Sequence, residues 1–112
     1  MDPENGLVDI DSFRKADLRV GRVTAAEDMG KSRKLIKLSV SFGKEEKTIL
    51  SGIRPSYSAE ELVGKKVVVV YNLKPASIMG MESQGMVLAA SDDSAVSLLS
   101  VDKDMPEGSR VT

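Results

Sequence analysis

Hydrophobic and polar residues alternate along several short stretches of this chain, which is the pattern of half-buried β-strands. The clearest stretch has Ile36, Leu38, Val40 and Phe42 separated by Lys37, Ser39 and Ser41. Residues 17–25 alternate less regularly. The phase slips after Gly21, which predicts a β-bulge or bend there, with Val23 and Ala25 continuing the apolar face.

Two further strands follow from apolar runs, and two short helices follow from capping patterns. Residues 47–53 predict a third strand, and the β-branched run 67–71 predicts a strand buried on both faces. Asp11 can cap a helical turn carrying residues 13–15. Ser58 and Glu61 match a capping box, so a helix of one to two turns is expected before Gly64.

The second half of the chain is less regular. Residues 73–84, with Met79, Gly80 and Met81, predict an unusually long loop, and long ordered loops are often functional. Residues 85–90 predict the fifth strand, and residues 96–101 a further short strand. Residues 1–8 predict a loose tail.

This order of elements predicts an all-β fold, namely a five-stranded Greek-key OB-fold barrel with short helices and a C-terminal β extension. An SH3-like barrel is the main alternative, but it does not require a helix between the third and fourth strands. The 112 residues suit a single domain, 1–112, with a core at about 8–90 and an extension, 91–112, that offers a dimer interface.

The amino-acid composition argues against several classes of function. The chain has no cysteine and no histidine, so it lacks the usual zinc ligands, the thiolate nucleophile and the commonest general acid or base. No tight carboxylate group appears, so we expect no catalytic centre, no metal site and no cofactor. No membrane-length apolar run and no signal peptide are visible, which predicts a cytoplasmic protein without a membrane partner.

The net charge of −1 hides a strong asymmetry along the chain. Residues 14–74 contain fourteen basic and seven acidic residues, whereas the remainder contains two basic and ten acidic residues. Between Met29 and Lys44 there are five basic residues and no acidic one. Because a local patch sets the field that a polyanion meets, this segment favours a nucleic-acid partner.

Five blocks of sequence, in order, carry a family resemblance. They are Asp17-Leu18-Arg19-Val20-Gly21, Ser32-Arg33-Lys34-Leu35, Ile49-Leu50-Ser51-Gly52-Ile53, Asn72-Leu73-Lys74-Pro75 and Gly80-Met81-Glu82-Ser83-Gln84-Gly85-Met86. Together they resemble the tRNA-binding domain found at the C-terminus of methionyl-tRNA synthetases and as free-standing dimeric proteins.

The resemblance implies an OB barrel that binds the outer side of the folded tRNA elbow without reading the anticodon. It also implies a homodimer built partly by the segment after the fifth strand. The chain looks like a non-catalytic beta subunit or accessory protein of methionyl-tRNA synthetase. Its first loop, residues 28–33, departs from the His-Pro-rich loop of many members and carries more positive charge.

The residues expected to bind tRNA are cations and hydrogen-bonding groups on the first two strands, the first loop and the segment before the fifth strand. Cations suit phosphates, and polar side chains suit ribose hydroxyls. The resemblance points to Ser83 and Met86 as RNA-contacting. The full set is Arg19, Arg22, Arg33, Lys34, Lys37, Asn72, Lys74, Ser83, Gln84 and Met86.

Two alternatives remain open. A chaperone or protein-interaction module is suggested by Met79 and Met81, since methionine-rich surfaces are adaptable binders. The chaperone relatives usually lack the Ser-Gln-Gly-Met block that this chain has. A cryptic enzyme rests only on scattered carboxylates. For the homodimer, the extension offers Val96, Leu98, Leu99 and Val101 as apolar surface.

Overall fold

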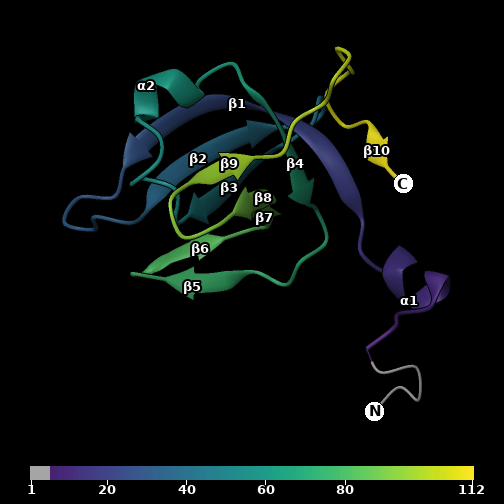
Figure 1. Ribbon diagram of the computed structural model, residues 1–112. Coiled ribbons are helices and arrows are strands. Elements are labelled where there is room, and N and C mark those ends of the chain that lie inside the picture. The colour runs from purple at the N-terminus through teal and green to yellow at the C-terminus, as the bar shows by residue number, and fades with distance from the viewer. Residues whose placement is uncertain (1–5) are drawn as a thin grey trace.

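The alternating segments form antiparallel strands that nearly close into a barrel in the computed structural model, which describes residues 6–112 (Figure 1). The neighbour order along the main sheet is β3-β2-β1-β4-β7. These strands are β1 (Leu18–Asp28), β2 (Ile36–Ser41), β3 (Glu46–Ser51), β4 (Lys66–Val70) and β7 (Met86–Val87). The predicted all-β barrel of the OB type is therefore confirmed.

Two short helices, two hairpins and one C-terminal strand surround this barrel. They are α1 (Ile10–Arg14), α2 (Ala59–Leu62), the β5–β6 hairpin (Ala76–Ile78 and Met81–Ser83), the β8–β9 hairpin (Ala89–Ser91 and Val96–Leu98) and β10 (Arg110–Val111). Helix α2 lies between β3 and β4, as predicted, and both bonds of the Ser58–Glu61 capping box form. Its Leu62 is fully buried and fixes the helix on the core.

The core fills the inside of the barrel with the inward-facing residues of each strand. Fully buried members include Val23, Leu38, Ile49, Val67 and Val69. Each such aliphatic side chain stabilises the fold by about 1.5–3 kcal/mol. The rings of Phe42 and Tyr71 meet edge to face, with their centroids 5.0 Å apart, and they confirm the core positions expected for both residues.

Strand β1 bends around the barrel, but its β-bulge does not lie at Gly21, where the sequence pattern predicts one. A side chain at Gly21 would overlap Val40 Cγ1 and come within 2.9 Å of Phe42, so glycine is needed for close packing. The predicted bulge at Gly21 is wrong, because the register shift against β2 lies between Val23 and Ala25. As a result Ala26, rather than Ala25, packs against the core.

Three other local predictions need correction. Asp9, not Asp11, caps α1, since its carboxylate accepts the Ser12 N–H. The predicted long loop of residues 73–84 contains the β5–β6 hairpin, and the predicted fifth strand is divided into β7 and β8. Of the predicted tail, residues 1–5 lie outside the described residues, whereas Leu7 and Val8 are exposed and have no regular structure.

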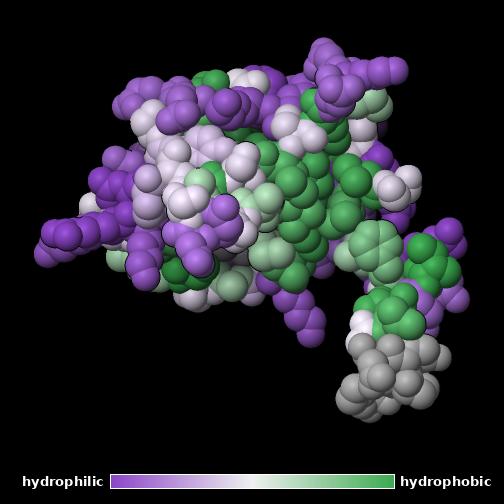
Figure 2. Space-filling view, in the orientation of Figure 1, coloured by the Kyte–Doolittle hydropathy of each residue, from purple (hydrophilic) through white to green (hydrophobic). Residues whose placement is uncertain are grey.

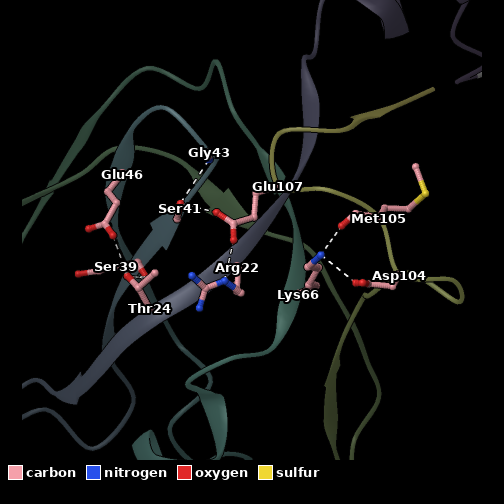
Figure 3. A network of polar contacts seen from close by, with 10 residues as sticks. All are labelled: Arg22, Thr24, Ser39, Ser41, Gly43, Glu46, Lys66, Asp104, Met105 and Glu107. Atoms are coloured by element: carbon pink, nitrogen blue, oxygen red, sulfur yellow. Dashed lines mark hydrogen bonds and ion pairs between the residues drawn. The ribbon is translucent and has the colours of Figure 1, made fainter.

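Residues 100–112, here called the C-terminal strap, cross back over the start of β1. Glu107 joins the strap to β1 and β2, because its carboxylate accepts hydrogen bonds from Arg22 Nε at 2.7 Å and Ser41 Oγ at 2.5 Å (Figure 3). Lys66 donates to Asp104 at 2.8 Å and to the Met105 carbonyl. Beyond these contacts β10 pairs with β1 at Leu18 and Arg19. The strap is thus part of the folded body.

Candidate nucleic-acid interface

The β1–β2 loop, residues 29–35, is held in one conformation by hydrogen bonds. The Ser32 hydroxyl accepts the N–H groups of Lys34 and Leu35 at 3.2 and 3.1 Å. Arg54, which lies just after β3, holds the loop through three contacts. Its guanidinium donates to the Ser32 carbonyl and pairs with Asp28 at 3.2 Å. Its backbone N–H donates to the Lys34 carbonyl at 3.1 Å. The loop is therefore a defined platform for its cations.

Three cations project from this platform into solvent. Lys31, Arg33 and Lys34 are exposed, and none of them makes an ion pair within residues 6–112. Lys37 follows on the outer face of β2 and pairs with Glu27 across the strands at 3.1 Å. A shallow hollow of about 180 Å³ lies beside it, lined by residues that include Ala25 and Ser39. The loop and the adjoining strand thus carry four cations, of which Lys37 alone is paired with a carboxylate within residues 6–112.

Ser83 and Gln84 join β3 to the segment before β7, where the barrel has no regular ladder of backbone hydrogen bonds between strands. The buried Ser83 hydroxyl accepts the Leu50 N–H at 3.0 Å and donates to the Gly85 carbonyl at 3.2 Å. Gln84 bonds Thr48 twice, through its backbone N–H and its side-chain oxygen, at 2.8 Å each. These polar groups close the barrel, so the hydroxyl of Ser83 is already occupied within the fold.

The same bonds set the direction of the β5–β6 hairpin. Because Gln84 lies opposite Thr48 and Ser83 opposite Leu50, the hairpin runs beside β3 toward Ser51. Its tip therefore projects at the end of the barrel where Arg54 holds the β1–β2 loop. Figure 1 shows both the hairpin tip and that loop projecting toward the left of the view. We call this the loop end of the barrel: residues 29–35, Arg54 and residues 78–81.

Arg19 lies far from the loop end. Glu27, the register partner of Lys37, is eight positions further along β1, which corresponds to about 26 Å of strand. Its guanidinium makes two 2.9 Å bonds to Asp17 and lies 4.6 Å from the centre of the Tyr71 ring. The hydrogen bond and charge of Arg19 hold the pKa of Asp17 below its ordinary value of 3.8. Arg19 is thus engaged within the fold.

Arg22 is likewise engaged, by Glu107 of the strap. The hydrogen bond from Ser41 and then that from Arg22 lower the pKa of Glu107 from its ordinary value of 4.5. Glu107 is ionised at neutral pH and neutralises Arg22. Half of the expected first-strand charge is therefore paired with a carboxylate of the strap.

The last three predicted site residues lie outside the loop end, and one of them contacts the end of α1. Asn72 joins that helix to the barrel, since its side chain accepts the Asp17 N–H and donates to the Lys15 carbonyl, both at 2.8 Å. Lys74 is exposed at the base of the hairpin, two residues before Ala76. Met86 is 46% exposed and pairs with Val70 at the end of β4. None of the three lies at the loop end.

The structure thus brings Arg33, Lys34 and Lys37 together and leaves Arg19, Arg22, Asn72 and Met86 apart from them. Figure 2 shows hydrophilic residues gathered at the left, over the loop end, and an apolar surface at the right that continues toward α1. Arg54 is not among the residues that the sequence pattern predicts for the site. Its place just after β3, whose partner strand begins beside the basic loop, is a signal that could have found it.

None of the helices within residues 6–112 has the length and apolar character needed to span a membrane. The described part of the chain also holds no group of three or more acidic side chains that could bind a metal ion.

Residues 18–110 match a family model described as a putative tRNA-binding domain. The chain is 56% identical to the methionine–tRNA ligase of Methanocaldococcus jannaschii over 105 residues and 51% identical to that of Deinococcus radiodurans over 108 residues. These matches cover 93% and 96% of this chain but only 16% of each ligase. The chain therefore spans about a sixth of the length of these relatives.

Two solved structures have the same fold over nearly their whole length. A protein related to methionyl-tRNA synthetase from Pyrococcus horikoshii superimposes with a TM-score of 0.89 at 47% identity, covering 95% of this chain and 98% of that one. The chaperone CsaA from Bacillus anthracis superimposes with a TM-score of 0.88 at 29% identity, covering 96% of this chain and 100% of that one.

Proposed function

Because this chain belongs to the tRNA-binding domain family, we propose that it binds folded tRNA through the loop end of its barrel. The observation that carries the proposal is the fixed group of exposed cations, Lys31, Arg33 and Lys34, on a loop clamped by Arg54. Lys37 and Lys74 extend this group along the outer face of β2 and the base of the hairpin. Ser83 and Gln84 support the surface by fixing the base of the hairpin, whereas Asn72 holds α1 against the barrel.

Recognition should depend on backbone charge and shape. Proteins that capture single strands stack bases on exposed aromatic rings. Here Phe42 is buried, Tyr71 packs against the core, and the Tyr57 hydroxyl is bonded to the Leu98 N–H at 2.9 Å. Phe13 is exposed but lies on α1. The loop end thus offers cations without an aromatic stacking platform, which suits a structured RNA.

We further propose that the chain acts as a single non-catalytic domain, 1–112, that supplies tRNA to a methionyl-tRNA synthetase in the cytoplasm. Support comes from its similarity to one part of several methionine–tRNA ligases. A domain that adds a second tRNA contact raises the local concentration of substrate at the catalytic unit without new chemistry.

We also propose a homodimer, with α1 and β10 at its interface. A groove of about 420 Å³ lies between them, lined by Ile10, Phe13 and Val111 together with Arg14 and Arg110. Ile10 and Phe13 are 57% and 47% exposed, which favours coverage by a partner. Of the extension residues expected to form the interface, Leu99 is 42% exposed, Val101 is half-buried, and Val96 and Leu98 are half-buried against the barrel core.

Polypeptide binding is a second candidate function. It is favoured by the similarity to the chaperone CsaA, and the apolar groove beside α1 would hold the polypeptide in a chain that is not paired there. Because the groove and the loop end lie on different parts of the molecule, the two functions can be tested separately.

The proposed function is tested by measuring the affinity for folded tRNA and for a single-stranded RNA of equal length over a range of salt concentrations. We expect tRNA to bind more tightly at moderate salt, with an affinity that falls steeply as salt rises. Equal affinity for the two ligands at moderate salt would contradict the proposal.

A further inference from the structure

The tip of the β5–β6 hairpin holds a methionine in an unfavourable backbone conformation. Ile78 pairs with Met81, so the connection is the two residues Met79 and Gly80. Both have positive φ angles, 50° and 79°. Such turns favour Asn-Gly or Asp-Gly, because a bulky side chain is disfavoured at positive φ. Met79 is the one residue other than glycine with a positive φ among residues 6–112.

The turn directs the Met79 side chain into solvent. Its exposed fraction is 60%, whereas its neighbours Ile78 and Met81 are half-buried. The rest of the hairpin is small or polar on its exposed surface, with Ala76, Ser77 and Glu82. The tip of the hairpin therefore presents one isolated apolar side chain, Met79, to solvent, although the positive φ angle of this residue is energetically unfavourable.

The base of the hairpin is fixed to the barrel. The bonds of Ser83 to Leu50 and of Gln84 to Thr48 fasten β6 along β3. Leu50 is in turn the register partner of Lys37. Two strand spacings, about 10 Å, therefore separate Lys37 from the hairpin base. From there the tip runs toward Arg54 and the loop that carries Arg33 and Lys34.

We propose that Met79 packs against the exposed face of a base in the bound RNA while the neighbouring cations hold the phosphates. This inference rests on the proposed function and adds an uncharged contact to it. An uncharged thioether side chain offers little to a phosphate, whereas it packs readily on a flat π surface. Bases whose faces are open occur at loops and stack ends of folded RNA, and proteins recognise RNA there. The surrounding positive charge favours RNA over an apolar protein groove.

The test compares Met79→Gly, Met79→Leu and the control Met105→Ala. Glycine relieves the positive φ, so Met79→Gly should fold at least as stably as the original chain. We expect it to bind folded tRNA about tenfold more weakly, from loss of the apolar contact, with an unchanged dependence of affinity on salt. Met79→Leu should restore most of the affinity. Met105, 41% exposed on the strap, should be replaceable without effect.

Distinct outcomes separate this inference from the proposed function. If the original chain binds tRNA and Met79→Gly binds it equally well, the inference is overturned and the proposed function stands. If Met79→Gly loses only the capture of an unfolded polypeptide, the tip belongs to a protein-binding surface, and the inference is again overturned. If the original chain fails to prefer folded tRNA, the proposed function fails first.

Discussion

The hydroxyl of Ser83 accepts the backbone N–H of Leu50 at 3.0 Å, across 33 positions of sequence. Both groups are buried, and the same hydroxyl donates to the Gly85 carbonyl. One serine therefore closes the barrel between β3 and β7 and fixes the base of the β5–β6 hairpin. Ser83, which belongs to the Gly80–Met86 block of the family resemblance, therefore has a structural role in the free protein.

Replacing Ser83 with alanine should destabilise the fold. The substitution leaves the buried Leu50 N–H without an acceptor, which costs about 1–3 kcal/mol in the free energy of unfolding. Urea denaturation measures the change, with Ser97→Ala, at an exposed position of β9, as the control. A change of stability no larger than that of the control would show that the Ser83 bond is dispensable.

Glu107 should make the stability of the strap depend on pH. Ser41 and Arg22 hold its pKa below 4.5 in the folded chain. A carboxylate with a lowered pKa contributes stability that is present above its unfolded pKa and is lost as the pH falls through the folded pKa. We expect Glu107→Gln to be less stable than the original chain at neutral pH, with the difference shrinking as the pH falls below 4.5.

The matched control for this experiment is Glu82→Gln, at an exposed position of β6. Unfolding free energies of the three proteins, measured by denaturant titration at a series of pH values, give the comparison. A difference between Glu107→Gln and the original chain that stays constant with pH would contradict the assigned role of the Glu107 charge.

The α1–β10 groove should control the association state. A charge placed at Ile10 and Phe13 is compatible with the folded chain, since α1 has no buried residue, but it would be costly in an apolar interface. We expect Ile10→Asp with Phe13→Asp to lower the mass in solution to that of one chain. Sedimentation or light scattering measures this mass. Val63→Asp, at a position 50% exposed beside α2, is the control and should leave the mass unchanged.

Local patterns predicted the barrel because residues 36–42 alternate strictly, residues 67–70 are a continuous β-branched run, and the Ser58–Glu61 box is a short-range signal. The β5–β6 hairpin was missed because its Met-Gly turn lacks the Asn-Gly or Asp-Gly pair that favours two-residue connections. The bulge was misplaced because Gly21 is required by Val40 and Phe42, which come from another part of the chain.

The candidate site was harder to predict than the fold, since a free cation cannot be told from a paired one in sequence. Asp17 is two residues from Arg19, so that pairing could have been anticipated. Glu107, which engages Arg22, is 85 residues away. The side chains of Arg33 and Lys34 remain exposed, because the hydrogen bonds that hold their loop are made by backbone groups, Ser32 and Arg54.

The salt dependence of tRNA binding by Arg33→Ala with Lys34→Ala tests the central claim most directly. Each phosphate contact contributes about 0.7–0.9 to the slope of log affinity against log salt concentration. If the loop end holds phosphates, this variant should bind more weakly and its slope should be smaller by about 1.4–1.8. The control, Lys44→Ala with Lys103→Ala, removes two exposed cations away from the loop end and should keep the original slope. An unchanged slope in the Arg33 and Lys34 variant, or an equal loss in the control, would contradict the assignment.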